Sequence, residues 1–183
     1  MAATLEIVEY NGVPAGTATT VTTVNFGTKD MINPIVAGAA DYNPIFRPAS
    51  GFNYSYWKSL GLKATGTFTD IRNIRWAVTT DPAWSLGTGG EKRIGNRDAG
   101  DIGCPLASYV QSIGTAGTTG NAIEAATTSG HTYYNTQTVM TKLWSAWPTS
   151  TPATIDSTAY TAACTSKLAV LQLQVASDGS DAD

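Results

Sequence analysis

The chain contains a single histidine, His131, in the segment TTSGHTYY. Any Ser-His-Asp or Cys-His catalytic group would have to use this residue, because both need an imidazole as general base. No G-x-S-x-G sequence and no cysteine-protease signature surrounds a candidate nucleophile. We therefore expect His131 to make a polar contact at the surface rather than to act as a catalytic base.

Two segments gather carboxylates around glycines, at residues 96–101 (NRDAGD) and 178–183 (DGSDAD). Their oxygen atoms suit calcium, but each segment lacks the bidentate Glu and the regular alternation of a calcium loop. The run from Gly114 to Gly120 has the glycines of a phosphate-binding loop, but no Lys-Ser/Thr pair follows it and no βαβ pattern surrounds it. We expect a hydrated turn, a hydrated tail and a flexible loop. The sequon at Asn53 carries little weight without a visible signal peptide.

Glycoside hydrolysis needs two facing carboxylates, and no spacing in the chain favours a pair. Aromatic side chains in loops can stack on sugars, and they can equally anchor protein interfaces. The candidates are Trp84, Trp144, Trp147, Tyr133 and Tyr134. We assign no catalytic, cofactor-binding or metal-ligating residue, we expect no cofactor, and we expect the chain not to be an enzyme.

The composition limits the partners. Charged residues make up 14% of the 183 residues and the formal net charge is -3. A general nucleic-acid binder needs a basic face, so direct nucleic-acid binding is not expected. Low surface charge favours a chain whose surface is partly covered by neighbours, which indicates a homo-oligomer or an assembly subunit. No apolar run reaches the roughly 18 residues of a membrane span, and the start MAATLEIVEY lacks the features of a secretory signal.

The two cysteines, Cys104 and Cys164, lie far apart and lack a CxxC spacing. A single disulfide is possible, but two reduced and partly buried thiols suit a protein that folds in a cytosol.

The elements that must position these residues are mostly strands. In the central stretch 54–78, alternation predicts a strand over 54–64, a turn at 65–67 and a second strand over 74–78, paired as an antiparallel hairpin. Lys58 and Trp57 interrupt the two faces, which suggests a sheet edge or a twist. A bulge or a late strand start is expected near Arg72.

Further strands are predicted at both ends of the chain. Leu5, Ile7 and Val8 suggest a short first strand, and residues 17–25 read as an edge strand or extended arm. Residues 26–52 read as a long irregular connection, and 79–103 as a loop. Strands are also predicted at 108–113, 136–144 and 167–176. In the last of these, Leu171, Leu173 and Val175 should face inward while Gln172 and Gln174 face outward.

These elements predict an all-β protein with a single β-sandwich, immunoglobulin-like or jelly-roll, an extended N-terminal arm and long loops. Residues 1–52 would form the first strand, the arm and the irregular connection, and 53–183 the sandwich core, within one domain overall. The expected core is Tyr56, Leu60, Leu62, Ile74, Trp76, Val110, Leu143, Leu171, Leu173 and Val175.

The stretch NYSYWKSLGLKATGTFTDIRNIRW (53–76), together with Tyr109-Val110-Gln111 and the following GTAGTTGN, resembles a group of accessory structural proteins of tailed bacteriophages and related viruses. The resemblance covers about half of the chain and carries over no functional residue. It implies a virion protein, most simply a capsid decoration or minor capsid protein. Such a protein would fold in the host cytoplasm and then bind the major capsid protein, or another virion protein, and its own copies. The alternative is a tail-associated or surface β-sandwich that binds a carbohydrate or receptor.

Overall fold

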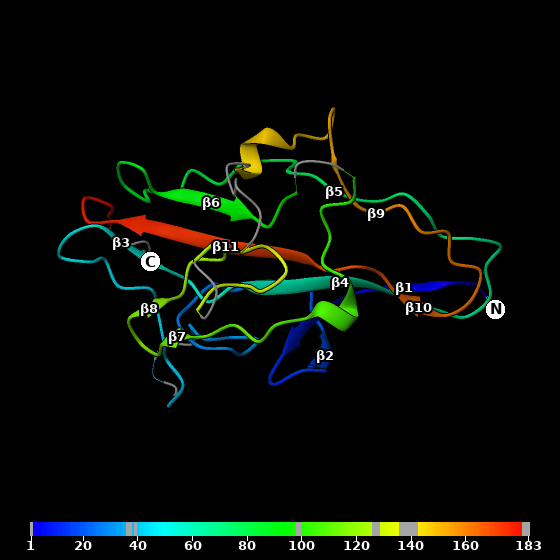
Figure 1. Ribbon diagram of the computed structural model, residues 1–183, viewed down its shortest axis with the longest axis horizontal. Helices are drawn as coiled ribbons and strands as arrows, with labels where there is room; N and C mark the ends of the chain where they lie inside the picture. Colours follow the sequence, from blue (N-terminus) through cyan, green and yellow to red (C-terminus); the bar gives the residue numbers. More distant parts are fainter. Residues whose placement is uncertain are drawn as a thin grey trace.

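The computed structural model describes residues 2–35, 38, 40–97, 100–125, 129–135 and 143–180. Its main element is a seven-stranded antiparallel sheet, ordered β2-β1-β4-β11-β3, in which β10 also pairs with β4 and β6 with β11 (Figure 1). The strands are β1 (Thr4–Asn11), β2 (Thr17–Thr20), β3 (Phe52–Tyr54), β4 (Lys58–Thr65), β6 (Glu91–Ile94), β10 (Cys164–Thr165) and β11 (Ala169–Ala176).

Smaller elements complete the described chain. β5 (Ile74–Trp76) pairs with β9 (Ala153–Asp156), and β7 (Gly114–Thr115) pairs with β8 (Thr119–Gly120). Two short 3-10 helices are present, η1 (Leu106–Ser108) and η2 (Trp144–Ala146). Within the described ranges, no helix is long and apolar enough to cross a membrane.

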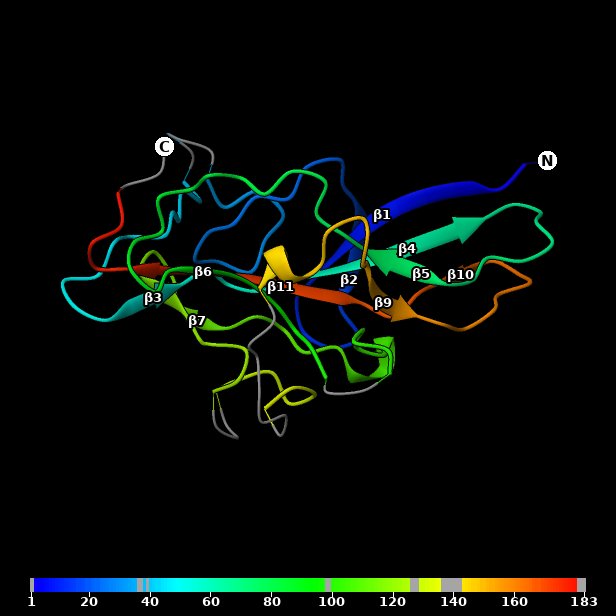
Figure 2. The same ribbon diagram turned by 90° about the horizontal axis from the view of Figure 1, so that it is seen from above.

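The expected all-β sandwich is confirmed, because apolar layers cover both faces of the large sheet. Alternate residues of β11 point to opposite faces, which is the period of a strand. Leu168 and Val170 join one cluster with Val8, Tyr10 and Trp57, whereas Ala169, Leu171 and Leu173 join a second cluster. We call these faces the loop-covered face and the groove face, respectively. Residues 106–125 cover the first, and the arm, residues 21–51, lies on the opposite side of β11 (Figure 2).

The predicted central hairpin is wrong. Both of its strands exist, but β4 pairs with β1, β10 and β11, while β5 pairs with β9. Alternation defines which side chains share a face and carries no information about which strand lies alongside. The bulge occurs between Ile74 and Arg75, in the β5–β9 pair. Lys58 is not at a sheet edge, because β4 is an interior strand and Lys58 is 1% exposed.

The other strand predictions had mixed results. β1, the edge strand β2, the irregular connection and β11 are confirmed. The strand predicted at 108–113 is wrong, and β6 lies inside the predicted loop 79–103. Of the predicted strand 136–144, residues 136–142 lie outside the described residues. Leu143 forms an isolated bridge with Arg93, and Trp144 begins η2.

The predicted core is confirmed in its β11 members and in Tyr56, which are buried. Its other members are only partly buried: Leu60, Leu62, Ile74, Trp76, Val110 and Leu143. The outward direction predicted for Gln172 and Gln174 is wrong, because all eight residues of β11 are buried. Both amides find hydrogen-bond partners inside the protein, which makes their burial possible.

Candidate functional site

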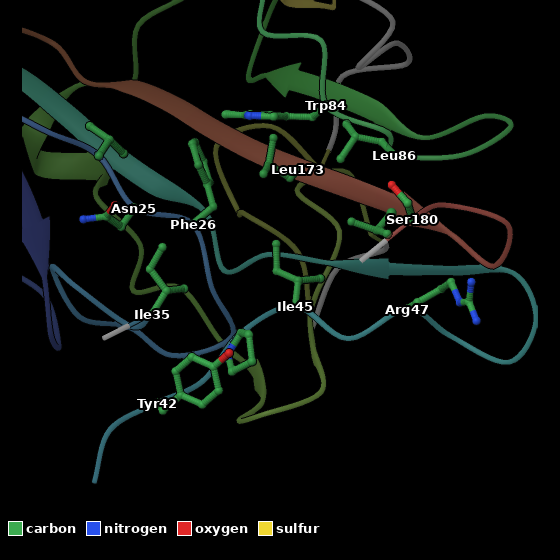
Figure 3. Close-up of a pocket in the computed structure, with 13 residues that line it drawn as sticks. Asn25, Phe26, Ile35, Tyr42, Ile45, Arg47, Trp84, Leu86, Leu173 and Ser180 are labelled. Atoms are coloured by element: carbon green, nitrogen blue, oxygen red, sulfur yellow. The ribbon is translucent and has the colours of Figure 1, made fainter. Parts of the chain in front are cut away.

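A groove of about 300 Å³ lies on the groove face, between the arm and the connection that leads into β6 (Figure 3). Leu173 and Val175 of β11 contribute to it from the sheet. The arm and the segment 84–86 supply most of the remaining wall. The lining residues are Val24, Asn25, Phe26, Ile35, Tyr42, Pro44, Ile45, Arg47, Trp84, Leu86, Leu173, Val175 and Ser180.

Backbone hydrogen bonds hold the arm in place against the sheet. Thr28 is fully buried, and its N–H and Oγ1 both donate to the carbonyl of Asn43, at 2.7 and 3.1 Å. Tyr56 N donates to the Gly27 carbonyl at 2.7 Å, and Asn53 Nδ2 donates to the Phe46 carbonyl at 2.7 Å. These bonds pair buried backbone groups of the irregular chain, as a covered segment requires.

Aromatic rings form one wall of the groove. Trp84 lies 6.4 Å from Phe26 and 5.8 Å from Trp144, measured between ring centroids and in edge-on geometry. Trp144 is buried, and its Nε1 donates to the Arg93 carbonyl at 2.9 Å. Trp84 remains 40% exposed, with Lys92 Nζ 6.0 Å from its ring centroid. An aromatic face that is open to solvent but supported from behind is a rigid surface for stacking or apolar contact.

The opposite end of the groove is polar. Arg47 Nη1 donates to the Gly179 carbonyl at 3.2 Å, and Ser180 lies beside it (Figure 3). The segment carrying Gly179 is fixed by Asp178, whose carboxylate accepts hydrogen bonds from Thr88 N and Oγ1. These bonds lower the pKa of Asp178. Arg47 is exposed and is the only charged side chain among the described residues of the lining.

The groove suits binding of an apolar or aromatic surface. Among the described residues of its lining, the titratable side chains are Tyr42 and Arg47. An apolar trough with one cation at its end favours an elongated apolar ligand or a protein segment that carries a negative charge.

The surface position expected for His131 is wrong. The side chain is 0% exposed and packs between Trp57 and Tyr134, at 5.6 and 5.0 Å. Its Nδ1 accepts a hydrogen bond from Tyr133 N. Burial lowers the pKa of His131 to about 4, so the imidazole is neutral at physiological pH. His131 is a core residue, enclosed by aromatic rings.

The two carboxylate clusters are held by internal contacts. Asp101 accepts hydrogen bonds from Lys167 Nζ at 2.6 Å and from Ser157 N at 3.1 Å. Burial raises the pKa of Asp101, but these bonds outweigh that effect and lower it overall. Residues 98, 99 and 181–183 lie outside the described residues. No group of three metal-ligating side chains occurs in the part of the chain that the structure describes.

The remaining candidates are mostly buried. Tyr134 is fully covered, Tyr133 stacks on Arg97, Trp147 is partly buried, and only Trp84 presents an open ring. Asn53 is buried in β3, so its sequon is covered in the folded chain. Within the predicted flexible loop 114–120, residues pair as the short hairpin β7–β8.

Both thiols are free, as expected. Cys104 is fully buried, and this burial raises its pKa to about 12.

Sequence reasoning missed most of the groove. Phe26, Ile45 and Arg47 lie in the connection read as irregular, and Leu86 lies in a predicted loop. The available signal was the exceptional length of that connection, because long ordered loops commonly carry function.

Comparison of the chain with protein-family models, with curated proteins and with solved structures found no match.

Proposed function

We propose that the chain is a non-enzymatic structural subunit of a virion, a capsid decoration or minor capsid protein that binds the capsid lattice and its own copies. One observation carries the proposal. Of the ten exposed large apolar side chains in the described part of the chain, seven lie before residue 53. They are Leu5, Ile7, Val13, Ile35, Tyr42, Phe46 and Phe52, which together we call the arm surface.

Exposed apolar side chains mark interaction surfaces when several occur together, and Ile35, Tyr42 and Phe46 all lie on the arm. Val13 is 72% exposed, Phe46 54% and Tyr42 49%. The arm is nevertheless ordered by internal hydrogen bonds, so its binding to a lattice would carry a small entropic cost. The low charge of the chain agrees with a surface that is covered in an assembly.

The edge strand β2 offers a second contact of the same kind. Its four residues, Thr17–Thr20, are all exposed, and they pair with β1 along one side. Edges of monomeric sheets are usually protected by charges or proline, whereas this edge is uncharged. Addition of a neighbour's strand to β2 is therefore the mode of contact that we propose for copies of the chain.

Particle incorporation tests the proposal. Deleting residues 1–25 is unsuitable, because Val8 and Tyr10 of β1 belong to the core. The sharper variant is Tyr42→Ser with Phe46→Ser, added to purified particles that lack this chain. We expect occupancy to fall by about tenfold or more at limiting concentration, because exposed aromatic anchors dominate many interfaces.

The matched control is Leu106→Ser with Ile113→Ser. These side chains are also exposed and apolar, at 37% and 41%, but lie outside the arm surface. The control should load normally. Absence of the wild-type chain from purified particles, or full occupancy of the arm variant, would contradict the proposal.

The second candidate is a tail-associated or surface protein that binds a carbohydrate or receptor through the groove. It is favoured by the open ring of Trp84, which lines the groove. Trp84→Leu keeps an apolar residue in the wall but removes the stacking face. Loss of glycan-array binding in a variant that still loads onto particles would assign recognition to the groove.

A further inference from the structure

Three side chains on the neighbouring strands β1 and β4 form a polar cluster that the proposed function does not use, and Asn11 is its partly buried member. Lys58 on β4 is 1% exposed and Glu9 on β1 is 0% exposed. Lys58 Nζ donates to Glu9 Oε1 at 2.8 Å, and Asn11 Nδ2 donates to the same oxygen at 3.1 Å. Asn11 is the last residue of β1. The last pair of the antiparallel β1–β4 register is Tyr10 with Ser59, so the next position along each strand places Asn11 opposite Lys58.

We propose that Lys58 and Asn11 form an intramolecular isopeptide bond, with Glu9 as the catalytic proton carrier. The reaction joins an amine to a carboxamide and needs no oxidant, metal or added reactant. It would link two neighbouring strands of the large sheet covalently.

The step balances within the cluster. Lys58 Nζ attacks Asn11 Cγ and forms the new C–N bond. Glu9 takes a proton from Nζ and delivers a proton to Nδ2, the Cγ–Nδ2 bond breaks, and ammonia leaves. One carboxyl oxygen already contacts both the attacking and the departing nitrogen, which is the geometry that proton transfer between them requires.

Burial prepares the proton carrier. A lysine amine must lose a proton to act as a nucleophile, and Glu9 Oε1 lies 2.8 Å from Lys58 Nζ to accept it. Burial raises the pKa of Glu9, even though Lys58 lies beside it. A carboxyl that retains a proton more readily is better suited to pass one on. Exclusion of water further protects the amide from hydrolysis.

Two buried oxygen atoms without hydrogen-bond partners lie in the same cluster. Glu9 Oε2 and Asn11 Oδ1 are buried and accept no hydrogen bond from any described residue. Such atoms are uncommon in folded proteins and need a physical reason, which a reactive centre supplies. The exposed pair Glu6–Lys63 on the same two strands is 3.9 Å apart and shows none of these features.

A competing reaction is disfavoured by the local geometry. In an Asn-Gly sequence, the following backbone nitrogen can attack Asn Cγ and release ammonia as well. Here Gly12 N donates to Asp30 Oδ2 at 2.7 Å, and Asn11 Nδ2 donates to Asp30 Oδ1 at 3.1 Å. Asp30 also accepts a bond from Gln111 Nε2 at 3.0 Å, so it is fixed in place and holds Gly12 N away from this reaction.

Mass spectrometry of the folded full-length chain, after incubation at neutral pH, tests the proposal. The intact mass should lie below the sequence mass by one ammonia. Tryptic digestion should then give a branched peptide in which residues 1–29 are joined to residues 30–63, because a linked Lys58 resists cleavage and Arg47 precedes proline.

Substitutions test the roles of Lys58, Glu9 and Asn11 separately. Lys58→Met and Glu9→Gln should both keep their full sequence masses, while the matched control Lys63→Met should still lose ammonia. Asn11→Asp should lose water instead and reach the same final mass as the wild type. The wild-type peptide map is decisive even if a variant fails to fold.

Three outcomes would overturn the inference. They are a wild-type chain without the branched peptide, ammonia loss that persists in Lys58→Met, and loss of water rather than ammonia from the wild type, which would place the link on a carboxylate. A link that still forms in Glu9→Gln would overturn the role of Glu9. None of these results bears on particle incorporation, so the isopeptide bond is tested independently of the proposed function.

Discussion

The imidazole of His131 is kept neutral by its surroundings. Trp57 and Tyr134 flank the ring, and burial lowers its pKa from 6.5 to about 4. Between these two values the unfolded chain binds a proton at this side chain, whereas the folded chain does not. The free energy of unfolding should therefore be at its full value above pH 6.5 and decrease as the pH falls towards 4.

We predict that this one residue accounts for about 3 kcal/mol of the decrease across that window. Urea unfolding of the wild type and of His131→Phe, at several pH values between 4 and 7, measures it. Phenylalanine keeps the aromatic packing but cannot be protonated, so the variant should show a flatter dependence on pH. Equal slopes for the two chains would contradict the assigned pKa.

Residues such as His131, Lys58 and Gln172 show why the sequence could not reveal every role. A polar residue in an apolar pattern looks the same whether it reaches solvent or meets a partner inside the fold. The partners of Lys58 are Glu9 and the Met31 carbonyl, which lie 49 and 27 residues away in the chain. Only the three-dimensional arrangement brings them together.

At the scale of elements, Gln172 fastens β11 to the segments that cover the loop-covered face. Its Nε2 donates to the Ser55 and Asn121 carbonyls, both at 2.8 Å, and its Oε1 accepts from Ile123 N at 3.1 Å. One amide thus serves three backbone groups that would otherwise be buried without partners. Each such group costs about 1–3 kcal/mol when left unpaired.

We therefore predict that Gln172→Leu lowers the free energy of unfolding by at least about 3 kcal/mol. The control is Gln174→Leu, two residues along the same strand. Gln174 Nε2 donates one bond, to the Gly89 carbonyl at 2.7 Å, so this change should cost about 1–2 kcal/mol. Chemical denaturation of both variants gives the comparison. Equal costs would show that the amide of Gln172 does not fasten these segments.

The strands that could be predicted are those with a clear sequence pattern of their own. β1, β2 and β11 have clear alternation or β-branched runs, and each was found. β6, β9 and β10 are only two to four residues long, so no local pattern distinguishes them. The central hairpin was wrong for a different reason, because two adjacent amphipathic strands do not have to pair with each other.

At the scale of the whole molecule, the arm converts a sheet face into a groove. Its lining residues run from Val24 to Ser180, so no segment of the sequence contains the site. The arm supplies more than half of the described lining and three of the seven residues of the arm surface. The fold class could be predicted from composition and alternation, but the groove depends on how an irregular segment lies on the sheet, for which the sequence offers no period.

Attachment of the arm depends on one close approach. A Cβ at Gly27 would lie 2.5 Å from Pro34 Cγ and 2.6 Å from the Asn43 carbonyl oxygen, distances that real side chains do not tolerate. Gly27→Ala should therefore displace the arm and lower the free energy of unfolding by about 1–3 kcal/mol.

Hydrogen exchange measures this displacement. Exchange should become faster at the amide of Thr28, which donates to Asn43 within the arm, and at the amide of Tyr56, which donates to Gly27 of the arm. Exchange should stay slow at the amide of Leu62, which donates to Ser166 Oγ. The control Ala40→Ser, at an exposed position of the same arm, should leave all three amides unchanged. Unaltered protection at Thr28 and Tyr56 in Gly27→Ala would mean that the arm is held by contacts other than this one.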